Sequence, residues 1–365
     1  MKVLALASYP VEAAATRYRL TQFILPLRER GISLDVRPFL SSHTFANLYK
    51  RERFLSNITS VGFALLSRIK DVLDAGRFDA LLIQREAMIF GPPVFEWLSN
   101  RLGNIPMILD LDDSTYISYV SPTYGRLGSW LKYFRKTDDL ISWAKVVTCG
   151  NRTIAEYAKQ KGKKTEIIPT VVDTTAFCPV PLRENQGKPV IGWIGTPSTF
   201  PYLQKIFPVL QKLSETHIYC LKIVGSGASK IELPGVEIDN LAWKLDREIK
   251  DFQSFDIGLY PIDDSLHANW ATGKSGFKAI QYMSVGIPFV VTPIGVCAEI
   301  GRLNQTHFAA NSPDDWESSL NNLLSNVKLR REMGAAGRAH ALSHYTVSQQ
   351  ADKLAGVLHQ AVGKK

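Results

Sequence analysis

Short apolar runs recur along the first half of the chain and alternate with longer segments of helical periodicity. The runs are apolar throughout, which is typical of strands buried on both faces of a parallel sheet. The first half therefore predicts a parallel, doubly wound α/β sheet. The expected strands are residues 2–8, 33–38, 80–84, 106–111, 146–149 and 166–168, and the expected helices are 16–30 and 95–101.

The pattern breaks at residues 179–188, a polar and turn-rich segment that is typical of a linker. The alternation then restarts, so we expect two similar α/β domains in tandem with a ligand-binding cleft between them. The predicted limits are 1–180 and 189–345, with a last helix in 346–365. Within the second half we expect strands at 190–194, 218–224, 235–238, 257–259 and 289–292, and helices at 201–213, 316–325, 329–343 and 348–362.

Composition and charge narrow the function classes. At 365 residues the chain exceeds the usual size of a single core, which agrees with two domains. Its formal net charge of +9 suits an anionic partner, which would be a nucleotide, a membrane surface or a nucleic acid. The sequence has no RNA-binding or basic-helix motif, so we expect no nucleic-acid partner.

The cysteines and the start of the chain bear on the compartment. Four widely spaced cysteines without a CxxC pair predict no zinc site and fit a reducing compartment. The chain enters a strand pattern at its start and has no apolar run near the roughly 20 residues of a membrane span. We therefore expect a cytoplasmic protein. The apolar stretch 54–69, flanked by Arg51, Arg53, Arg68 and Lys70, predicts either peripheral contact with a membrane or packing on its own domain.

Residues 273–288 carry the clearest chemical signal. They read Gly-Lys-Ser-Gly-Phe-Lys-Ala-Ile-Gln-Tyr-Met-Ser-Val-Gly-Ile-Pro, which predicts a glycine-marked loop, a short helix and a turn. Lys274 and Lys278 frame the start of the helix, and Gly276 and Phe277 leave its backbone open. A helix N-terminus beside cations is an anion site, so we predict a phosphate-bearing ligand. The alternative is a pair of solvated surface lysines.

A second candidate loop is Gly195-Thr196-Pro197-Ser198-Thr199, between the strand 190–194 and a helix. Gly195 allows close approach of the backbone. The hydroxyls of Thr196, Ser198 and Thr199, together with N–H groups, are suited to phosphate oxygens. The alternative is an ordinary strand-to-helix turn with a serine or threonine N-cap.

Two arginines follow the first strand's loop. Arg17 and Arg19 carry guanidinium groups that match phosphate or carboxylate geometry, so we predict a phosphate- or acceptor-binding role. Residues two apart do not share a helix face, so one of them is expected to point inward and the other outward. The alternative is ordinary helix-surface charge.

Three carboxylates end the strand 106–111 and its loop. Asp110, Asp112 and Asp113 are costly at a strand end unless they are hydrogen-bonded or functional. They fit a metal site of the DxD type, acid/base chemistry, or binding of sugar hydroxyls. The alternative is helix capping by Asp113 or Ser114.

With these motifs in hand, nearly the whole chain resembles bacterial glycosyltransferases of family 4, which have the two-Rossmann-domain GT-B architecture. The most specific match is Asp256-Ile-Gly-Leu-Tyr-Pro followed by the block 273–288. The supporting matches are Arg17-Tyr-Arg with Gln22, Gln84-Arg-Glu, Gly91-Pro-Pro, Asp110-Leu-Asp-Asp, Ile168-Pro-Thr-Val-Val-Asp173 and Ile191-Gly-Trp-Ile-Gly-Thr.

The resemblance implies transfer of a hexose from a nucleotide-diphosphate sugar to a saccharide or lipid-linked acceptor, with retention of configuration, in cell-surface glycan synthesis. It implies no cofactor and no metal. The second domain would bind the donor, the first domain the acceptor, and the last helix would return to the first domain. The loop 195–199, Lys274 and Lys278 would face the diphosphate, and Gln281 the ribose. Asp112 and Asp113 would lie near the donor sugar or the acceptor hydroxyl as catalytic residues.

Three departures from the family pattern accompany the resemblance. Gln281 replaces the ribose-binding glutamate, and an amide lacks the charge-assisted strength of a carboxylate. Thr196 and Pro201 stand where an arginine and a lysine often occur, and Glu12-Ala-Ala-Ala replaces a glycine pair. These departures leave open a non-catalytic GT-B protein that binds sugar nucleotides or glycans. A GT-B epimerase or phosphorylase is the other enzyme hypothesis.

Overall fold

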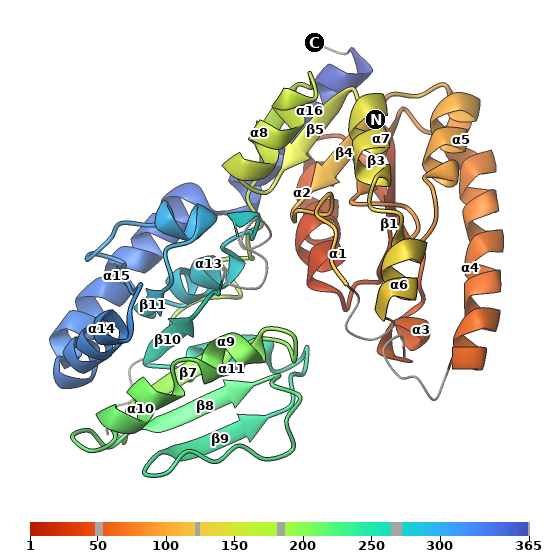
Figure 1. Cartoon of the computed structure of the whole chain (residues 1–365). Helices are drawn as coiled ribbons and strands as arrows, with labels where there is room; N and C mark the ends of the chain where they lie inside the picture. The colour runs from red at the N-terminus through yellow and green to blue at the C-terminus, as the bar shows by residue number, and fades with distance from the viewer. Residues whose placement is uncertain (48–53, 121–124, 181–186, 264–271, 364–365) are drawn as a thin grey trace. The chain divides into compact units, whose positions relative to one another are not determined.

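The computed structural model describes residues 1–47, 54–120, 125–180, 187–263 and 272–363 (Figure 1). Internal contacts divide the chain into two compact units. The first unit comprises Met1–Thr170, Gly273–Ser275 and Val347–Lys365, and the second comprises Val171–Thr272 and Gly276–Thr346. The chain thus passes between units at Thr170, ahead of the polar segment 179–188.

The first unit is built on a six-stranded parallel sheet in the order β2-β1-β3-β4-β5-β6. The central strands β1, β3, β4 and β5 are almost wholly buried, because their apolar residues are covered on both faces. This confirms the predicted doubly wound sheet. The strands are β1 (Lys2–Ala7), β2 (Ser33–Pro38), β3 (Ala80–Gln84), β4 (Met107–Leu111), β5 (Val146–Cys149) and β6 (Thr165–Ile167).

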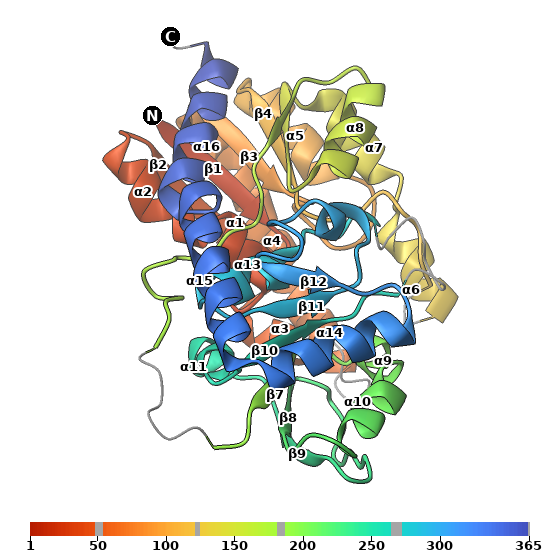
Figure 2. The ribbon, with the colours of Figure 1, turned by 90° about the vertical axis from the view of Figure 1, so that its left-hand side faces the viewer.

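Helices cover both faces of this sheet. The helix α16 (Val347–Val362) packs beside α2 and against β3, β4 and β5, which confirms the predicted return of the last helix (Figure 2). The expected helix 16–30 is broken at Leu20, whose φ of −126° is not helical. The other helices of the unit are α1 (Ala14–Arg19), α2 (Ile24–Glu29), α3 (Ser42–Asn47), α4 (Phe54–Asp74), α5 (Val94–Gly103), α6 (Gly125–Lys132), α7 (Lys136–Trp143) and α8 (Arg152–Gln160).

The second unit repeats the plan with a parallel sheet in the order β12-β11-β10-β7-β8-β9. Its strands are β7 (Val190–Ile194), β8 (Cys220–Val224), β9 (Glu237–Leu241), β10 (Ile257–Tyr260), β11 (Phe289–Val291) and β12 (His307–Ala309). Its helices are α9 (Phe200–Gln204), α10 (Phe207–Leu213), α11 (Glu248–Gln253), α13 (Phe277–Ser284), α14 (Pro313–Ser325) and α15 (Val327–His344).

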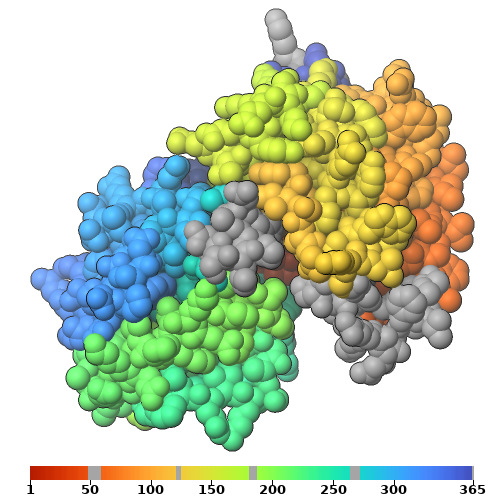
Figure 3. Space-filling view, in the orientation of Figure 1, coloured from red at the N-terminus to blue at the C-terminus, as the bar shows by residue number. Residues whose placement is uncertain are grey.

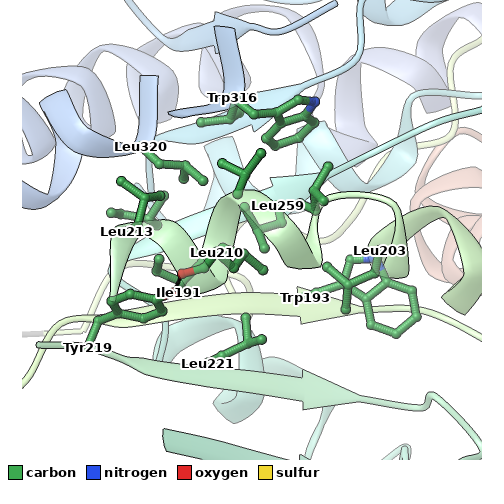
Figure 4. Close-up of a cluster of buried hydrophobic side chains, with 14 of the residues drawn as sticks. Ile191, Trp193, Leu203, Leu210, Leu213, Tyr219, Leu221, Leu259, Trp316 and Leu320 are labelled. Carbon is green, nitrogen blue, oxygen red and sulfur yellow. Dashed lines mark hydrogen bonds between the residues drawn. The ribbon is translucent and has the colours of Figure 1, made fainter. Parts of the chain in front are cut away.

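The core of the second unit fixes its sheet against α10 and α14. Leucines of α10 and Trp316 and Leu320 of α14 lie over Ile191 and Trp193 of β7 (Figure 4). The expected helix 201–213 is in fact two helices, because Pro208 stands in the first turn of α10 and starts it anew. The rigid core places the loops at the carboxyl ends of the strands.

No helix within the described ranges is both long enough and apolar enough to span a bilayer.

Candidate functional site

Each sheet has one point at which its strand order reverses. In the first unit it lies between β1 and β3, and in the second between β7 and β10. In open α/β sheets, ligands bind outside the carboxyl ends of the strands at such a point, because the two loops there diverge to opposite faces. The segments that matter are therefore those after β1, β3, β7 and β10.

The loop after β7 is a tight turn held by its own side chains. The Thr196 N–H donates to Thr199 Oγ1 at 3.1 Å, and the Thr199 N–H donates to the Thr196 carbonyl oxygen at 2.9 Å. The hydroxyls of Thr196 and Ser198 lie 2.9 Å apart, on exposed residues. The turn expected of a hydroxyl-capped loop is present, and its outer hydroxyls are accessible to a ligand.

The loop after β8 packs directly on this turn. A Cβ at Gly225 would lie 2.4 Å from the carbonyl oxygen of Gly195, and the φ of Gly225 is +83°. Only glycine fits such an approach of two backbones. The two loops therefore form one continuous backbone surface at the carboxyl edge of the second sheet.

Helix α13 is anchored over the reversal point of the second sheet. The Tyr282 hydroxyl donates to the carbonyl oxygen of Leu259 in β10 at 3.0 Å and lies 3.3 Å from that of Gly192 in β7. Burial raises the pKa of Tyr282 far above its usual value, so the hydroxyl remains a donor. This anchor fixes where the first turn of α13 begins.

The first turn of α13 has the features of an anion site. Its N-cap is Gly276 in the left-handed conformation, with a φ of +65°, and this glycine has no side chain with which to cap the helix. Lys278 lies in that turn, with Nζ 5.8 Å from the ring centre of Tyr260, the last residue of β10. The predicted glycine-marked loop, helix start and lysine thus coincide at the carboxyl edge of the sheet.

One turn further along α13 lies Gln281. Its side chain is 3% exposed, and its Nε2 has no hydrogen-bond partner. Leaving a buried amide unpaired costs about 1–3 kcal/mol, so the position is unfavourable for stability alone. The site therefore holds a polar group whose hydrogen-bonding capacity is unused within the described chain.

Lys274 does not belong with Lys278 in the same unit. The segment Gly273–Ser275 groups with the first unit, whereas Lys278 belongs to the second. Asn151 explains this grouping, because its Nδ2 donates to the carbonyl oxygens of Gly273 at 2.9 Å and Lys274 at 3.1 Å. Its Oδ1 meanwhile accepts from the Ile154 N–H and caps α8. Of the two framing lysines, Lys278 is the one that belongs to the same unit as the loop after β7.

In the first unit, Arg19 is turned inward. Its guanidinium pairs with the Asp110 carboxylate, with Nε to Oδ2 at 2.9 Å, and also donates to the Ile168 carbonyl oxygen. Burial opposes the charge of Arg19, but Asp110 outweighs it and raises the pKa of the guanidinium. Thr148 Oγ1 donates to the same carboxylate at 2.6 Å. A ligand would have to displace Asp110 in order to reach Arg19.

Arg17 has a different environment from Arg19. It is half-buried, and its Nη1 donates to the carbonyl oxygens of Val11 at 3.2 Å and Glu12 at 3.0 Å. Its guanidinium lies 4.6 Å from the ring centre of Tyr18. Arg19 thus faces the interior of the unit, whereas Arg17 does not project outward and instead supports the loop that follows β1.

The carboxylate of Asp112 is also held by hydrogen bonds within the first unit. Arg85 donates to it through Nε at 2.5 Å and Nη2 at 2.8 Å, and Gln84 Nε2 donates at 3.0 Å. Burial alone would raise the pKa of Asp112, but the Arg85 charge and hydrogen bonds hold it below the usual value. Asp112 is therefore an ionised group that fixes Arg85, and it is a poor proton acceptor.

Asp113 is the more accessible of the two predicted catalytic carboxylates. Its side chain is 26% exposed, and its Oδ1 accepts from the N–H of Ser114 at 2.9 Å. Its Oδ2 lies 3.7 Å from Nη2 of Arg85. Within the described range 54–120, no helix begins at Asp113 or Ser114, so the helix-capping alternative is wrong, and the accessible carboxylate remains.

Residues 212–356 match the family model described as glycosyl transferase-like. Solved structures align over almost the whole chain: HepE of Anabaena in complex with UDP-glucose (14% identity, 99% and 100% of the two chains, TM-score 0.69) and a glycosyltransferase of Rickettsia africae (13%, 100% and 99%, 0.70). The chain has the GT-B fold.

A third GT-B neighbour is sucrose-phosphate synthase of Thermosynechococcus elongatus, at 11% identity over all of both chains and a TM-score of 0.68. No curated protein matches the chain. At these identities the neighbours establish the fold. The glycosyl transferase-like match covers α13, Lys278 and Gln281, and it extends into α16.

In this GT-B chain, sequence reasoning passed over Arg85 as a site residue. Its φ of +61° is unusual for a non-glycine residue, and its bidentate pairing with Asp112 holds it there. The next residue, Glu86, is buried between Lys132 and Lys136, at 3.2 and 2.8 Å. The sequence feature that could have indicated Arg85 is the polar run Gln84-Arg-Glu at the end of a buried strand.

The alternative prediction for the aspartates is a metal site of the DxD type. Asp110 and Asp112 both pair with arginines, as described above. Within the described ranges, no cluster of three or more histidine, cysteine or acidic side chains has the arrangement of a metal site. The charge partners of these carboxylates here are guanidinium groups.

Proposed function

We propose that this chain is a retaining glycosyltransferase of the family-4 type. It would transfer a hexose from a nucleotide-diphosphate sugar to a saccharide or lipid-linked acceptor. The glycosyl transferase-like match over 212–356 supports the reaction class, and the HepE neighbour was crystallised with UDP-glucose. The proposal places the donor on the second unit and the acceptor on the first.

One observation carries the proposal. The first turn of α13, which follows the left-handed Gly276 and carries Lys278, begins at the carboxyl edge of β10, beside the reversal point where β7 meets β10. A diphosphate bound there would meet backbone N–H groups, the helix dipole and a cation together. The exposed hydroxyls of Thr196 and Ser198 belong to the same edge and would contact the outer phosphate oxygens.

The chemistry follows from the leaving group. The bond between the sugar C1 and the phosphate oxygen breaks, and its electron pair leaves on the nucleotide diphosphate. The oxygen of the acceptor hydroxyl forms the new bond to C1, and its proton passes to the departing diphosphate. Negative charge grows on the phosphate, so fixed donors and Lys278 stabilise the transition state more than the ground state. This side chain and the helix dipole would supply most of the electrostatic help.

The first unit would contribute a carboxylate and a fixed cation. Asp113 is the accessible carboxylate and would lie near the acceptor hydroxyl or the donor sugar. Asp112 acts as a positioning residue that holds Arg85 by two hydrogen bonds. We propose that the reaction takes place in the cytoplasm and serves cell-surface glycan synthesis. Four free cysteines agree with a reducing compartment.

The test is turnover of donor by purified protein. Radiolabelled UDP-, GDP-, ADP- and TDP-hexoses are incubated with the chain, with and without mixed glycan acceptors, and released nucleotide is measured. The proposal expects release with one of these donors, and transfer of label when the acceptor is suitable. Tight donor binding without any release would instead support a sugar-nucleotide-binding protein. Gln281, Thr196 and Pro201 favour that second candidate, because all three replace charged residues in the family pattern.

Replacing Gln281 with leucine separates stability from donor binding. The substitution removes, at similar volume, a buried amide whose Nε2 has no hydrogen-bond partner among the described residues, so the melting temperature is expected to stay the same or rise. If the amide binds ribose hydroxyls, donor affinity should fall about tenfold, the size of one lost hydrogen bond. Calorimetric titration with the best donor provides the measurement. If the Gln281→Leu variant bound the donor with unchanged affinity, Gln281 would not be part of the donor site.

A further inference from the structure

Helix α4 carries an apolar stripe on the outside of the first unit. Phe63 is 74% exposed, Leu66 62%, Ile69 49% and Leu73 74%. At about 100° per residue, these four and the exposed Lys70 fall within an arc of roughly 120°. We call these five residues the outer face of α4. The helix stands at the right-hand edge of the unit, and its orange atoms lie at the surface (Figures 1 and 3).

The opposite side of α4 holds the helix firmly to the sheet. Arg68 is buried and donates to the carbonyl oxygens of Ala7 at 2.6 Å and Ala87 at 2.9 Å. Val72 is buried on the same side. The packing expected of this helix is therefore present, and the outer face is additional to it. A contiguous apolar stripe on an otherwise well-packed helix is typical of an interaction surface.

The charged residues on and near α4 indicate which kind of partner fits its outer face. The helix sequence has two acidic residues, Asp71 and Asp74, and each lies 3.0 Å from Nη1 of Arg37, outside the five residues of the outer face. Asp74 also pairs with the exposed Arg77 that follows the helix, at 3.4 Å, and Lys70 is exposed within the stripe. An apolar face that carries an exposed lysine, beside acids that are each paired with an arginine, is complementary to a negatively charged apolar boundary.

The neighbouring helix α5 has the same character. It packs beside α4 and exposes Val94, Trp97 and Leu102. Its one acid, Glu96, is buried and accepts from the N–H of Ala87 at 2.8 Å. Tryptophan is favoured where an apolar layer meets water.

We propose that the outer face of α4 docks on an anionic phospholipid bilayer. The four apolar side chains would enter the boundary between headgroups and acyl chains, with Lys70 at the phosphates. The net charge of +9 adds long-range attraction to such a surface. A second copy of the chain suits the face less well, because two-fold pairing would bring two copies of Lys70 together.

Vesicle co-sedimentation tests the proposal. The chain is mixed with vesicles of phosphatidylcholine alone, or with added phosphatidylglycerol. We expect binding to the anionic vesicles that weakens with salt. The double variant Phe63→Ser/Leu66→Ser should bind about tenfold more weakly or worse, since two exposed apolar groups are lost. Ile218→Ser, which changes a residue 75% exposed in the second unit, is the matched control and should bind normally.

The variant Lys70→Glu tests the contribution of charge to vesicle binding. It should weaken binding to anionic vesicles by about tenfold or more. The melting temperature and its donor-induced rise should be unchanged in all variants. Failure of the membrane proposal can therefore be distinguished from failure of the proposed glycosyltransferase function. Absence of vesicle binding, or binding that ignores both variants, would overturn the proposal. So would a dimer in solution that Phe63→Ser/Leu66→Ser dissociates without any effect on vesicle binding.

Discussion

Lys278→Ala is expected to slow sugar transfer about 100- to 1000-fold, the usual effect of removing one preorganised group that stabilises transition-state charge. The fall should appear in both KM and kcat, because Lys278 would contact the diphosphate of the bound donor and the charge on that diphosphate grows further as the C1–O bond breaks. Lys278 is only half-buried, so the melting temperature without ligand should change little. Steady-state kinetics with the best donor provide the measurement.

Two companion variants sharpen this result. Lys278→Arg keeps the charge and should retain more activity than the alanine variant, although its longer fork fits the site less well. Lys212→Ala removes an exposed lysine of α10 that pairs with Glu317, and it should transfer at the parental rate. Equal activity in Lys278→Ala and the parent would remove the first turn of α13 from the chemistry.

Asp110→Ala is expected to destabilise the first unit by about 3–5 kcal/mol, because it leaves the buried Arg19 guanidinium without its counter-charge. Thr148 Oγ1 loses its acceptor as well. For a unit of this size, the change corresponds to a fall in melting temperature of roughly 10 °C. Urea denaturation followed by circular dichroism provides the measurement.

The double variant Arg19→Met/Asp110→Leu is the informative control. Replacing both partners removes the unpaired charge, and it should recover much of the lost stability. Asp352→Ala breaks the exposed pair with Arg30 in the same unit and should leave the transition where it was. If Asp110→Ala were as stable as the parent, Arg19 would be available to a ligand and would regain its predicted acceptor-side role.

The fold was predictable because its strands are buried on both faces. Continuous apolar runs such as 80–84 have few alternatives to a central parallel strand, and the structure has β3 there. The strand β12 escaped notice because it has only three residues, beginning at His307. The helix α8 escaped for a related reason, since its surface carries many polar residues and its N-cap Asn151 has no distinctive sequence context.

The part of the site that could be predicted consists of residues that are close together in the sequence. A loop, a helix start and a lysine adjacent in sequence are visible as one motif, and Gly276 and Lys278 share the first turn of α13. The partners of the aspartates are not adjacent. Arg19 lies 91 residues from Asp110, and Arg85 lies 27 residues from Asp112. Only the sheet register brings them together.

Backbone geometry accounts for another part that sequence did not reveal. Nothing in the sequence around Arg85 signals a positive φ, because the Asp112 pairing that holds it belongs to another strand. The grouping of Lys274 with the first unit likewise depends on the side chain of Asn151, far away in sequence. The sequence therefore identified which residues lie at the carboxyl edges of the two sheets. It did not identify the role of each residue.

The most direct test of the account is the melting temperature of the chain in millimolar UDP-, GDP-, ADP- and TDP-hexoses. A ligand at about 100 times its Kd stabilises the folded state by about 2.7 kcal/mol, which is readily measured. We predict that one nucleotide class raises the melting temperature of the parent by several degrees, and that Lys278→Ala loses most of this rise. A panel in which no nucleotide-sugar changes the melting temperature would contradict the account.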